Sequence, residues 1–370
     1  MQPRVNVIHD YRRSKAMLKR ISGKLFKTAY IYLLFLFVPG ILLLAGCNNN
    51  PSTEEESSDF FAMDTYMTVT AYGDKAKEAV KQARDRIYML DSMLSATNKN
   101  SQIYMLNENG FASFSKEAAY LMERSFEVNR LTEGAFNPAI YPVMQLWGFT
   151  DDNYRVPSKE EIAGVLSSTN LNDIVFDKTT GSISFSKPDM KIGFGGIAKG
   201  YASSEIMKIF RDNNISHGIV SLGGNIQVMG SRPDGSPWNV AIKNVDDSAD
   251  YIGILHVSDK AVITSGGYER FFENNGKVYH HIIDPSTGEP ADSGILSATI
   301  VSEDGTLADA LSTAVYVMGA DKAVDFWKKY GNSEFGSFEE IILTDTGKLY
   351  VTEGVADIFD TGLEVTVVNR

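Results

Sequence analysis

Two oxygen-bearing side chains stand four residues apart in the segment Thr306-Leu-Ala-Asp309-Ala-Leu-Ser312-Thr313. If this segment is helical, Asp309 and Thr313 lie on one helix face, a single turn apart. A carboxylate and a hydroxyl placed in this way are hard oxygen ligands, which suit Mg²⁺ that bridges the phosphates of a substrate. The same residues also fit a purely structural interpretation, in which Thr306 caps the helix and Asp309 stabilises its first turn.

A glycine-rich segment, Gly193-Phe-Gly-Gly-Ile-Ala-Lys-Gly200, directly precedes a helical pattern. Backbone N–H groups of such a loop can bind phosphate, and Lys199 would add a positive charge. The segment contains G-x-G-x-x-A, but it lacks the later acidic residue of a Rossmann motif and the ending of a P-loop. Anion binding and ordinary tight turns both remain open here. A second glycine pair, in Ser221-Leu-Gly-Gly224, favours a turn after a strand.

Adjacent histidines, His280 and His281, begin the segment HHIIDPSTGEP. In an extended strand neighbouring side chains face opposite sides, so only one of the two can point into a given cleft. An inward histidine could act as a general base, although a structural role in the core is the more common one. Asp284 is followed by Pro-Ser-Thr-Gly, which favours a turn that the aspartate could cap.

The composition limits the classes of protein to consider. The chain has 370 residues, 43% of them hydrophobic, and a single cysteine, which indicates a globular protein of one or two domains. Its net charge of -12 argues against nonspecific nucleic-acid binding. The sequence contains no His-Glu-x-x-His, paired-cysteine or Gly-x-Ser-x-Gly pattern, which argues against zinc hydrolases and serine esterases.

Residues 1–46 have the pattern of an export signal. Eight basic residues within the first 27 positions are followed by an apolar run from Ile31 to Leu44. Pro39 and Gly40 interrupt this run, which is shorter than the roughly 20 residues that span a bilayer. The tetrapeptide Leu44-Ala-Gly-Cys47 resembles the lipobox of bacterial lipoproteins, so Cys47 is expected to be lipidated. An uncleaved signal anchor is the alternative.

The rest of the chain predicts a short tether and one folded domain. Residues 47–59 are polar and acidic and contain Pro51, which predicts a tether, and residues 60–370 are expected to form a single domain. Hydrophobic periodicity predicts a strand over 60–72, a helix over 75–94, further helices after 115, from 199 and near 309 and 322, and mainly strands over 218–301. This order predicts an α+β fold with largely antiparallel sheets and flanking helices.

In combination these segments resemble the ApbE-type FAD:protein FMN transferases, over nearly all of residues 60–365. Eight segments occur in the order of that family: Met63-Asp-Thr65; Leu94 to Ser101; Gly134-Ala-Phe-Asn137 with Leu146-Trp-Gly-Phe149; Gly193 to Tyr201; Ser221 to Gly224; Thr264-Ser-Gly266; His281 to Gly288; and Ala308 to Thr313. The resemblance implies a domain that binds Mg²⁺ and FAD as substrate, transfers FMN to a Ser or Thr hydroxyl of an exported flavoprotein and releases AMP. Two other functions remain open: an Mg²⁺-dependent FAD pyrophosphatase, and a surface lipoprotein that binds FAD without turnover.

The resemblance also implies roles for individual residues. Asp309 and Thr313 match metal ligands of the family, Gly196 falls where a loop carbonyl completes the coordination, and Ser312 lies where some members have a second acidic ligand. His281 matches the histidine proposed to assist deprotonation of the acceptor hydroxyl. The positions expected to contact FAD are Met63, Thr97, Ala135, Phe136, Asn137, Gly193, Lys199 and Ile283. The expected partners are exported redox proteins, and the expected location is extracytoplasmic, on the membrane through a lipid at Cys47.

Three positions depart from the usual pattern of the family. Asp64 stands where glycine is usual, Asn137 replaces the more common aspartate, and Gly193 stands where many members have aspartate. We expect these differences to change backbone approach and polar contacts to FAD, while the metal ligands and the histidine are retained.

Overall fold

The computed structural model of the protein describes residues 54–245 and 250–370. The predicted signal segment and Cys47 lie outside these residues. The described residues belong to one compact unit. Within this part of the chain, no helix is both long and apolar enough to cross a membrane.

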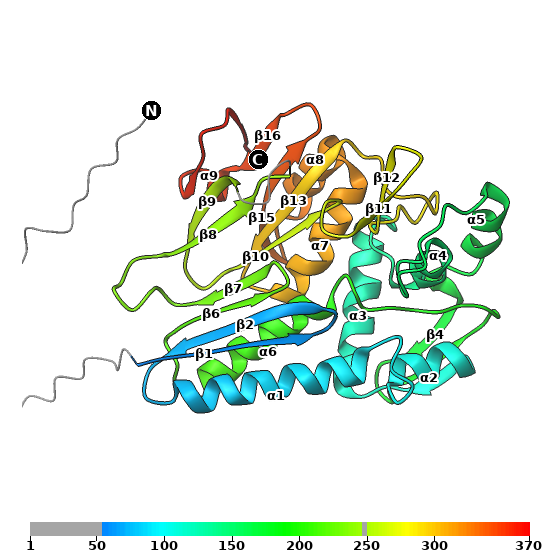
Figure 1. The fold of residues 1–370 in the computed structure, drawn as a ribbon, viewed down its shortest axis with the longest axis horizontal. Coiled ribbons are helices and arrows are strands. Elements are labelled where there is room, and N and C mark those ends of the chain that lie inside the picture. Colours follow the sequence, from blue (N-terminus) through cyan, green and yellow to red (C-terminus); the bar gives the residue numbers. More distant parts are fainter. Residues whose placement is uncertain (1–53, 246–249) are drawn as a thin grey trace, which may run out of the picture. The chain divides into compact units, whose positions relative to one another are not determined.

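A ten-stranded sheet forms the centre of the fold, with strand order β1-β2-β6-β7-β10-β13-β15-β16-β18 and β14 paired to β15 (Figure 1). Neighbouring strands are antiparallel except for β16 and β18, which are parallel. The expected α+β fold with a mostly antiparallel sheet is therefore confirmed. The strands are β1 (Glu55–Ala62), β2 (Thr65–Tyr72), β6 (His217–Leu222), β7 (Asn225–Met229), β10 (Ala261–Gly266), β13 (Ile295–Ser302), β14 (Asn332–Ser333), β15 (Gly336–Thr344), β16 (Leu349–Thr352) and β18 (Val365–Val368).

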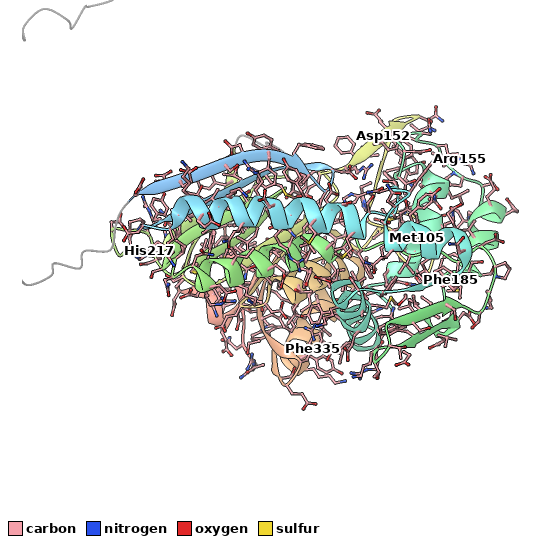
Figure 2. All side chains as sticks on the ribbon, turned by 90° about the horizontal axis from the view of Figure 1, so that it is seen from below. Met105, Asp152, Arg155, Phe185, His217 and Phe335 are labelled. Carbon is pink, nitrogen blue, oxygen red and sulfur yellow. The ribbon has the colours of Figure 1, made fainter. Side chains whose placement is uncertain are left out.

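Long helices cover one face of this sheet. They are α1 (Ala76–Leu94), α3 (Lys116–Leu131), α6 (Ala198–Asp212), α7 (Gly305–Met318) and α8 (Ala320–Tyr330). Their apolar stripes and the facing strand residues form the largest core cluster, which includes Leu90, Ile206, Leu311 and Phe338. Figure 2 shows α1 lying across this face with α6 beside it.

A smaller sheet packs on the opposite face. Its strands are β8 (Trp238–Lys243), β9 (Tyr251–Val257) and β17 (Phe359–Asp360), and their apolar residues form a second cluster with Val262 and Ile341 of the main sheet. The next residues in sequence, Ile263 and Ile342, belong to the helix-side cluster. This alternation shows that the main sheet is buried on both faces at β10 and β15.

The remaining elements lie beside these layers. A three-stranded sheet contains β3 (Phe111–Ser113), β4 (Ile174–Asp177) and β5 (Ser182–Phe185), and α2 (Gln102–Asn109) leads into it. A third apolar cluster joins α4 (Tyr141–Trp147) and α5 (Lys159–Leu166) to Ile283. The hairpin of β11 (Phe271–Asn274) and β12 (Lys277–His280) ends directly before His281. Short elements complete the order: η1 (Pro138–Ile140), η2 (Leu171–Asp173) and α9 (Glu353–Ala356).

Several expected elements are confirmed, and one is wrong. The helix over 75–94 is α1, and the helix after Ser115 is α3, whose N-cap is Ser115. The single strand expected over 60–72 is instead a hairpin, because Ala62 pairs with Thr65 across a two-residue turn. Such a turn preserves the period of two, so alternation alone could not reveal it. Strand β1 also begins at Glu55, inside the segment expected to be a tether.

Candidate active site

A cavity of about 1170 Å³ lies at one end of the main sheet. The β1–β2 turn, the β6–β7 turn and the C-terminal end of β10 meet there, because these antiparallel strands all bring those points to the same edge. Twelve of the residues expected to act in binding or catalysis line it: Met63, Thr97, Ala135, Phe136, Asn137, Gly193, Gly196, Lys199, His281, Ile283, Asp309 and Thr313. The structure therefore brings together segments that are far apart in the sequence.

Asp309 is held by the adjacent helix. It is only 4% exposed, and its Oδ2 accepts a 2.8 Å hydrogen bond from the backbone N–H of Gly200 in α6. A Cβ at position 200 would lie 2.1 Å from the carbonyl oxygen of Gly305 and 2.5 Å from the Asp309 Cβ, so only glycine allows the two helices to pack this closely. In the described part of the chain Asp309 Oδ1 accepts no hydrogen bond, and it remains available to a cation.

Thr313 and Gly196 complete this side of the cavity. A Cβ at Gly196 would lie 3.5 Å from Thr313 Oγ1, so the glycine loop runs directly past the hydroxyl. The described residues contain no cluster of three or more His, Cys, Asp or Glu side chains suited to a metal. A cation beside Asp309 would therefore have one carboxylate ligand and otherwise neutral oxygens. That donor set fits Mg²⁺, which usually keeps waters and takes further oxygens from substrate phosphates.

Ser312 is the one expected ligand that the structure does not bring to the cavity. Its side chain is fully buried, and its hydroxyl donates a 2.8 Å hydrogen bond to the backbone oxygen of Asp309. Its oxygen lies 2.8 Å from Ser265 Oγ, and Ser265 does line the cavity. Ser312 thus supports the wall from behind.

The N-cap of α7 is not Thr306, the residue that the structural interpretation of the sequence placed there. The N-cap is Asp304, whose Oδ1 accepts hydrogen bonds from the backbone N–H groups of Thr306 and Leu307 at 2.9 and 3.2 Å. A cap at Thr306 is therefore wrong. Because Asp304 already satisfies the first turn, Asp309 is not needed as a capping residue.

The glycine-rich loop leads directly into α6, which begins at Ala198. Its glycines and the first residues of the helix line the cavity, so the helix N-terminus lies at the cavity wall. The ammonium group of Lys199 lies 3.4 Å from the carbonyl oxygen of Gly195, and among the described residues it forms no ion pair. Its charge is therefore available to an anionic ligand.

Only one of the two histidines lines the cavity, and it is His281, which lies just beyond the end of β12. His281 lines the cavity, whereas His280 packs edge-on against Tyr316. His281 Nδ1 lies 3.1 Å from the carbonyl oxygen of Arg270, and because a carbonyl can only accept, Nδ1 carries the proton and Nε2 is a free acceptor. Burial lowers the pKa of His281 to about 4, so the ring is neutral at pH 7.

The turn residues Met63 and Asp64 both have left-handed backbone conformations, with φ of 48° and 58°. This is the conformation of a two-residue hairpin turn, in which glycine or asparagine is usual. The carboxylate of Asp91 in α1 accepts a hydrogen bond from the Met63 backbone and so holds the turn. Burial, reinforced by the nearby Asp64, raises the pKa of Asp91.

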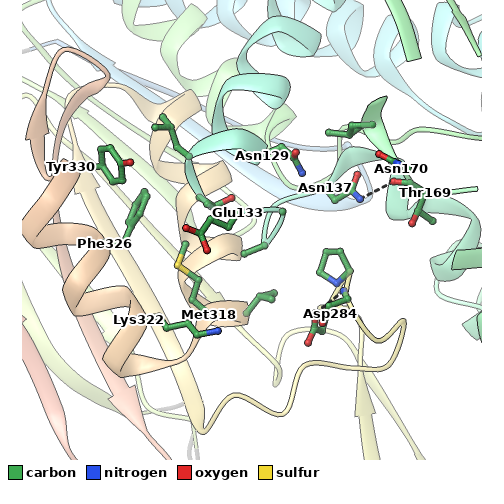
Figure 3. Close-up of a pocket in the computed structure, with 18 of the residues that line it drawn as sticks. Asn129, Glu133, Asn137, Thr169, Asn170, Asp284, Met318, Lys322, Phe326 and Tyr330 are labelled. Carbon is green, nitrogen blue, oxygen red and sulfur yellow. Dashed lines mark hydrogen bonds between the residues drawn. The ribbon is translucent and has the colours of Figure 1, made fainter. Parts of the chain in front are cut away.

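Asn137 and Gly193, the other two positions that depart from the usual family pattern, each fit their local surroundings. Asn137 donates from Nδ2 to the Thr169 carbonyl oxygen and accepts from the Ala139 N–H, both at 2.9 Å. Figure 3 shows the first of these bonds, which an ionised aspartate could not make. A Cβ at Gly193 would lie 2.7 Å from the ring of Tyr141, so a side chain at 193 requires that ring to move.

A second cleft of about 740 Å³ adjoins the first and shares Ala135 and Asn137 with it (Figure 3). Asp284 lies on this second cleft. Its Oδ1 accepts hydrogen bonds from the backbone N–H and the hydroxyl of Ser286, at 2.8 and 2.7 Å. The predicted turn-capping role of Asp284 is thus confirmed.

Sequence reasoning missed several polar residues of the cavity, among them Asn225, Lys243 and Glu269. Burial raises the pKa of Glu269, and the nearby Lys199 and Lys243 act in the opposite direction. In the main sheet Asn225 begins β7 and Glu269 follows the end of β10, whereas Lys243 ends β8 of the smaller sheet. The sequence could indicate that these residues lie near strand ends. It could not show which strand ends meet, because that depends on the order of the strands.

Comparison with known proteins shows the family of the chain. The model of the ApbE family matches residues 63–335. An FAD:protein FMN transferase from Klebsiella pneumoniae (strain 342) is 30% identical over 236 residues, which cover 63% of this chain and 73% of that protein. One from Haemophilus influenzae is 28% identical, with 76% and 82% covered.

The fold agrees as well. The crystal structure of the ApbE protein from Thermotoga maritima has a TM-score of 0.75 at 33% sequence identity, and the match covers 81% of this chain and 98% of that one. The structure of the flavin transferase ApbE from Vibrio cholerae, at 24% identity, has a TM-score of 0.73. The chain therefore belongs to the ApbE family.

Proposed function

We propose that this protein is an Mg²⁺-dependent FAD:protein FMN transferase, which transfers FMN from FAD to a Ser or Thr hydroxyl of another protein and releases AMP. The observation that carries the proposal is the meeting of Asp309, Thr313, Gly196 and Lys199 in one cavity. At about 1170 Å³ the cavity exceeds the roughly 300–1,000 Å³ of a typical small-molecule pocket. It offers room for a dinucleotide and for part of an acceptor.

The residues of the cavity would have separate roles in phosphoryl transfer. Asp309 Oδ1 and Thr313 Oγ1 would hold Mg²⁺, with the Gly196 carbonyl as a further oxygen ligand, and the bound ion would neutralise charge on the pyrophosphate. Lys199 places a second positive charge at the same wall. His281 offers an unprotonated Nε2 to which an attacking hydroxyl can donate its hydrogen bond.

The proposal is tested by intact-mass analysis. The full-length chain is incubated with FAD, Mg²⁺ and an exported flavoprotein that presents the acceptor hydroxyl, and a parallel sample contains EDTA. A mass gain of one FMN that EDTA prevents supports the transferase. Free FMN and AMP with an unmodified acceptor would instead show an FAD pyrophosphatase, and bound intact FAD without products would show a binding protein.

We further propose that Cys47 carries a lipid that anchors the protein on the extracytoplasmic side of the membrane, where exported redox proteins are its acceptors. The basic segment, the apolar run and the lipobox-like tetrapeptide of the sequence support this location. Metabolic labelling with palmitate tests it. Wild type should be labelled and found in the membrane fraction, whereas Cys47→Ser should lose the label; equal labelling of both would contradict the assignment.

A further inference from the structure

Two exposed aromatic residues stand at the edge of the cavity. Phe61 is 65% exposed and Tyr66 is 62% exposed. Among the large hydrophobic side chains that are exposed in the described part of the chain, only these two line the cavity. Aromatic surface left in water at such a place calls for a physical explanation.

The pair belongs to a well-defined part of the fold. Phe61 and Tyr66 are directly opposite one another in the β1–β2 register, one residue pair away from the Met63–Asp64 turn. Their neighbours Phe60 and Met67 face the helices and are buried, so the exposed pair lies on the other face of the hairpin. Because β2 also pairs with β6, the hairpin is a rigid support for both rings.

The residues that line the cavity also include a charged pair. Asp152 and Arg270 line the cavity and form an ion pair of 3.3 Å. The same cavity thus offers both an apolar and a charged contact.

A protein substrate must pass close to the entrance of this cavity. The hydroxyl of a serine or threonine is only one carbon away from the main chain, so the acceptor backbone has to come near Asp309 and Thr313 for its oxygen to react. The residues that flank the acceptor hydroxyl then lie against the rim of the cavity. Phe61 and Tyr66 are the large apolar groups at that rim.

We propose that Phe61 and Tyr66 form the docking contact for the acceptor protein, by packing against apolar side chains that flank the acceptor hydroxyl. This inference rests on the proposed transferase function. Phe and Tyr are enriched in interface cores, and a few such anchors usually supply most of the binding energy. Both side chains have few rotatable bonds, so little conformational entropy is lost when they are covered.

The test compares each cavity residue with a matched residue elsewhere. In the full-length chain Phe61→Ala is paired with Phe111→Ala, because Phe111 is 66% exposed on β3 and does not line the cavity. Tyr66→Ala is paired with Tyr251→Ala, since Tyr251 is 52% exposed on β9 and also lies away from it. The KM for the acceptor, the Kd for FAD and the thermal midpoint are measured for all four variants and for wild type.

Phe61→Ala and Tyr66→Ala should each raise the KM for the acceptor about tenfold, with the Kd for FAD within about twofold of wild type. The two control variants should match wild type in both constants. Calorimetric binding of an unreactive acceptor, with alanine in place of its reactive residue, should weaken by the same factor. That measurement keeps the test valid if turnover of a variant is too low to fit.

Three results would overturn the proposal. An unchanged KM in both variants would show that the acceptor does not contact the pair, and an equal loss in the control variants would show a general surface effect. A weakened Kd for FAD that accounts for the whole loss would place the rings on the nucleotide. If wild type modifies no acceptor, the transferase function itself fails, whereas transfer by wild type with normal variants refutes only the docking contact.

Discussion

Asp309 Oδ2 and the backbone N–H of Gly200 are joined by a 2.8 Å hydrogen bond that links α7 to α6. Gly200 lies only four residues after Gly196 of the glycine-rich loop. The bond therefore fixes the position of the Asp309 carboxylate, the proposed metal ligand, relative to that loop. A hydrogen-bond donor to a metal-ligating side chain orients that side chain, and its removal commonly weakens metal affinity by roughly 10–100-fold. The loop and the ligand therefore form one structural unit.

The first prediction separates the metal role of Asp309 from its structural role. Asp309→Asn keeps an oxygen that can accept from the Gly200 N–H but removes the negative charge, so Mg²⁺-dependent transfer should fall more than about 100-fold with little change in stability. Asp309→Ala should also lose about 1–3 kcal/mol, because a buried N–H is left unpaired. Transfer rates against Mg²⁺ concentration and urea unfolding measure the two effects. Normal transfer by Asp309→Asn would contradict the metal assignment.

The second prediction concerns the close packing of α6 and α7. Gly200→Ala would bring a methyl group to 2.1 Å from the Gly305 carbonyl oxygen, so the helices must separate, and the free energy of unfolding should fall by about 1–3 kcal/mol. Gly164→Ala in α5 is the control, because nothing lies within 4 Å of its added Cβ. It should be neutral or stabilising by up to ~1 kcal/mol. Equal effects of the two changes in urea unfolding would refute the packing argument.

The third prediction concerns Glu340, which is 1% exposed in β15 and whose two carboxylate oxygens have no hydrogen-bond partner among the described residues. Burial, reinforced by Glu339, raises the pKa of Glu340 well above its usual value. The folded state therefore binds this proton more tightly than the unfolded state does. Its contribution to stability is complete below the usual glutamate pKa of about 4.3 and is lost progressively as the pH rises toward the raised folded-state pKa.

Glu340→Gln removes this titration and keeps the shape of the side chain. The wild-type free energy of unfolding should fall by up to ~1.4 kcal/mol per pH unit through this range, relative to the variant. Urea unfolding at pH 4 to 8 measures the difference. Glu364→Gln, at an exposed position, is the control and should parallel wild type. If Glu340→Gln also parallels wild type, Glu340 is not buried as a neutral acid.

The fourth prediction follows from the pKa of His281, about 4. A ring that is neutral well below pH 7 should keep its acceptor nitrogen over the whole physiological range, so transfer should show no loss attributable to this group between pH 8 and 6. His281→Gln should lower the transfer rate at saturating FAD while the Kd for FAD stays constant. Equal losses in rate and in FAD binding would make His281 a binding or folding residue instead.

The parts of the fold that depend on local pattern could be predicted from the sequence. The helical spacing of Val80, Ile87 and Leu94 is repeated in the buried face of α1, and Gly223 and Gly224 both have the positive φ of a turn. The β1–β2 hairpin escaped prediction because its turn preserves the alternation. The cap of α7 was misplaced because Asp304 and Thr306 are both good capping residues, and only the backbone shows which one is used.

The spacing of Asp309 and Thr313 was enough to predict that they share a helix face, and both line the cavity. The sequence could not show that Ser312, one residue before Thr313, points away from the cavity, because that depends on the rotation of α7 against β10. Nor could it show that Gly200 is required by close helix packing, or that Lys199 and Lys243 are near enough to Glu269 to lower its pKa. These relations are set by strand order and helix contacts between distant segments.

The central claim is that the Asp309 cavity transfers FMN to a protein hydroxyl. Its most direct test is the ratio of AMP released to FMN bound to the acceptor. In one reaction with the full-length chain, FAD, Mg²⁺ and an acceptor, the AMP released and the FMN bound to the acceptor are both quantified over time. If the cavity transfers FMN to the acceptor, AMP and acceptor-bound FMN appear in equal amounts and at equal rates. AMP that accumulates with an equal amount of free FMN, and with none on the acceptor, would contradict it.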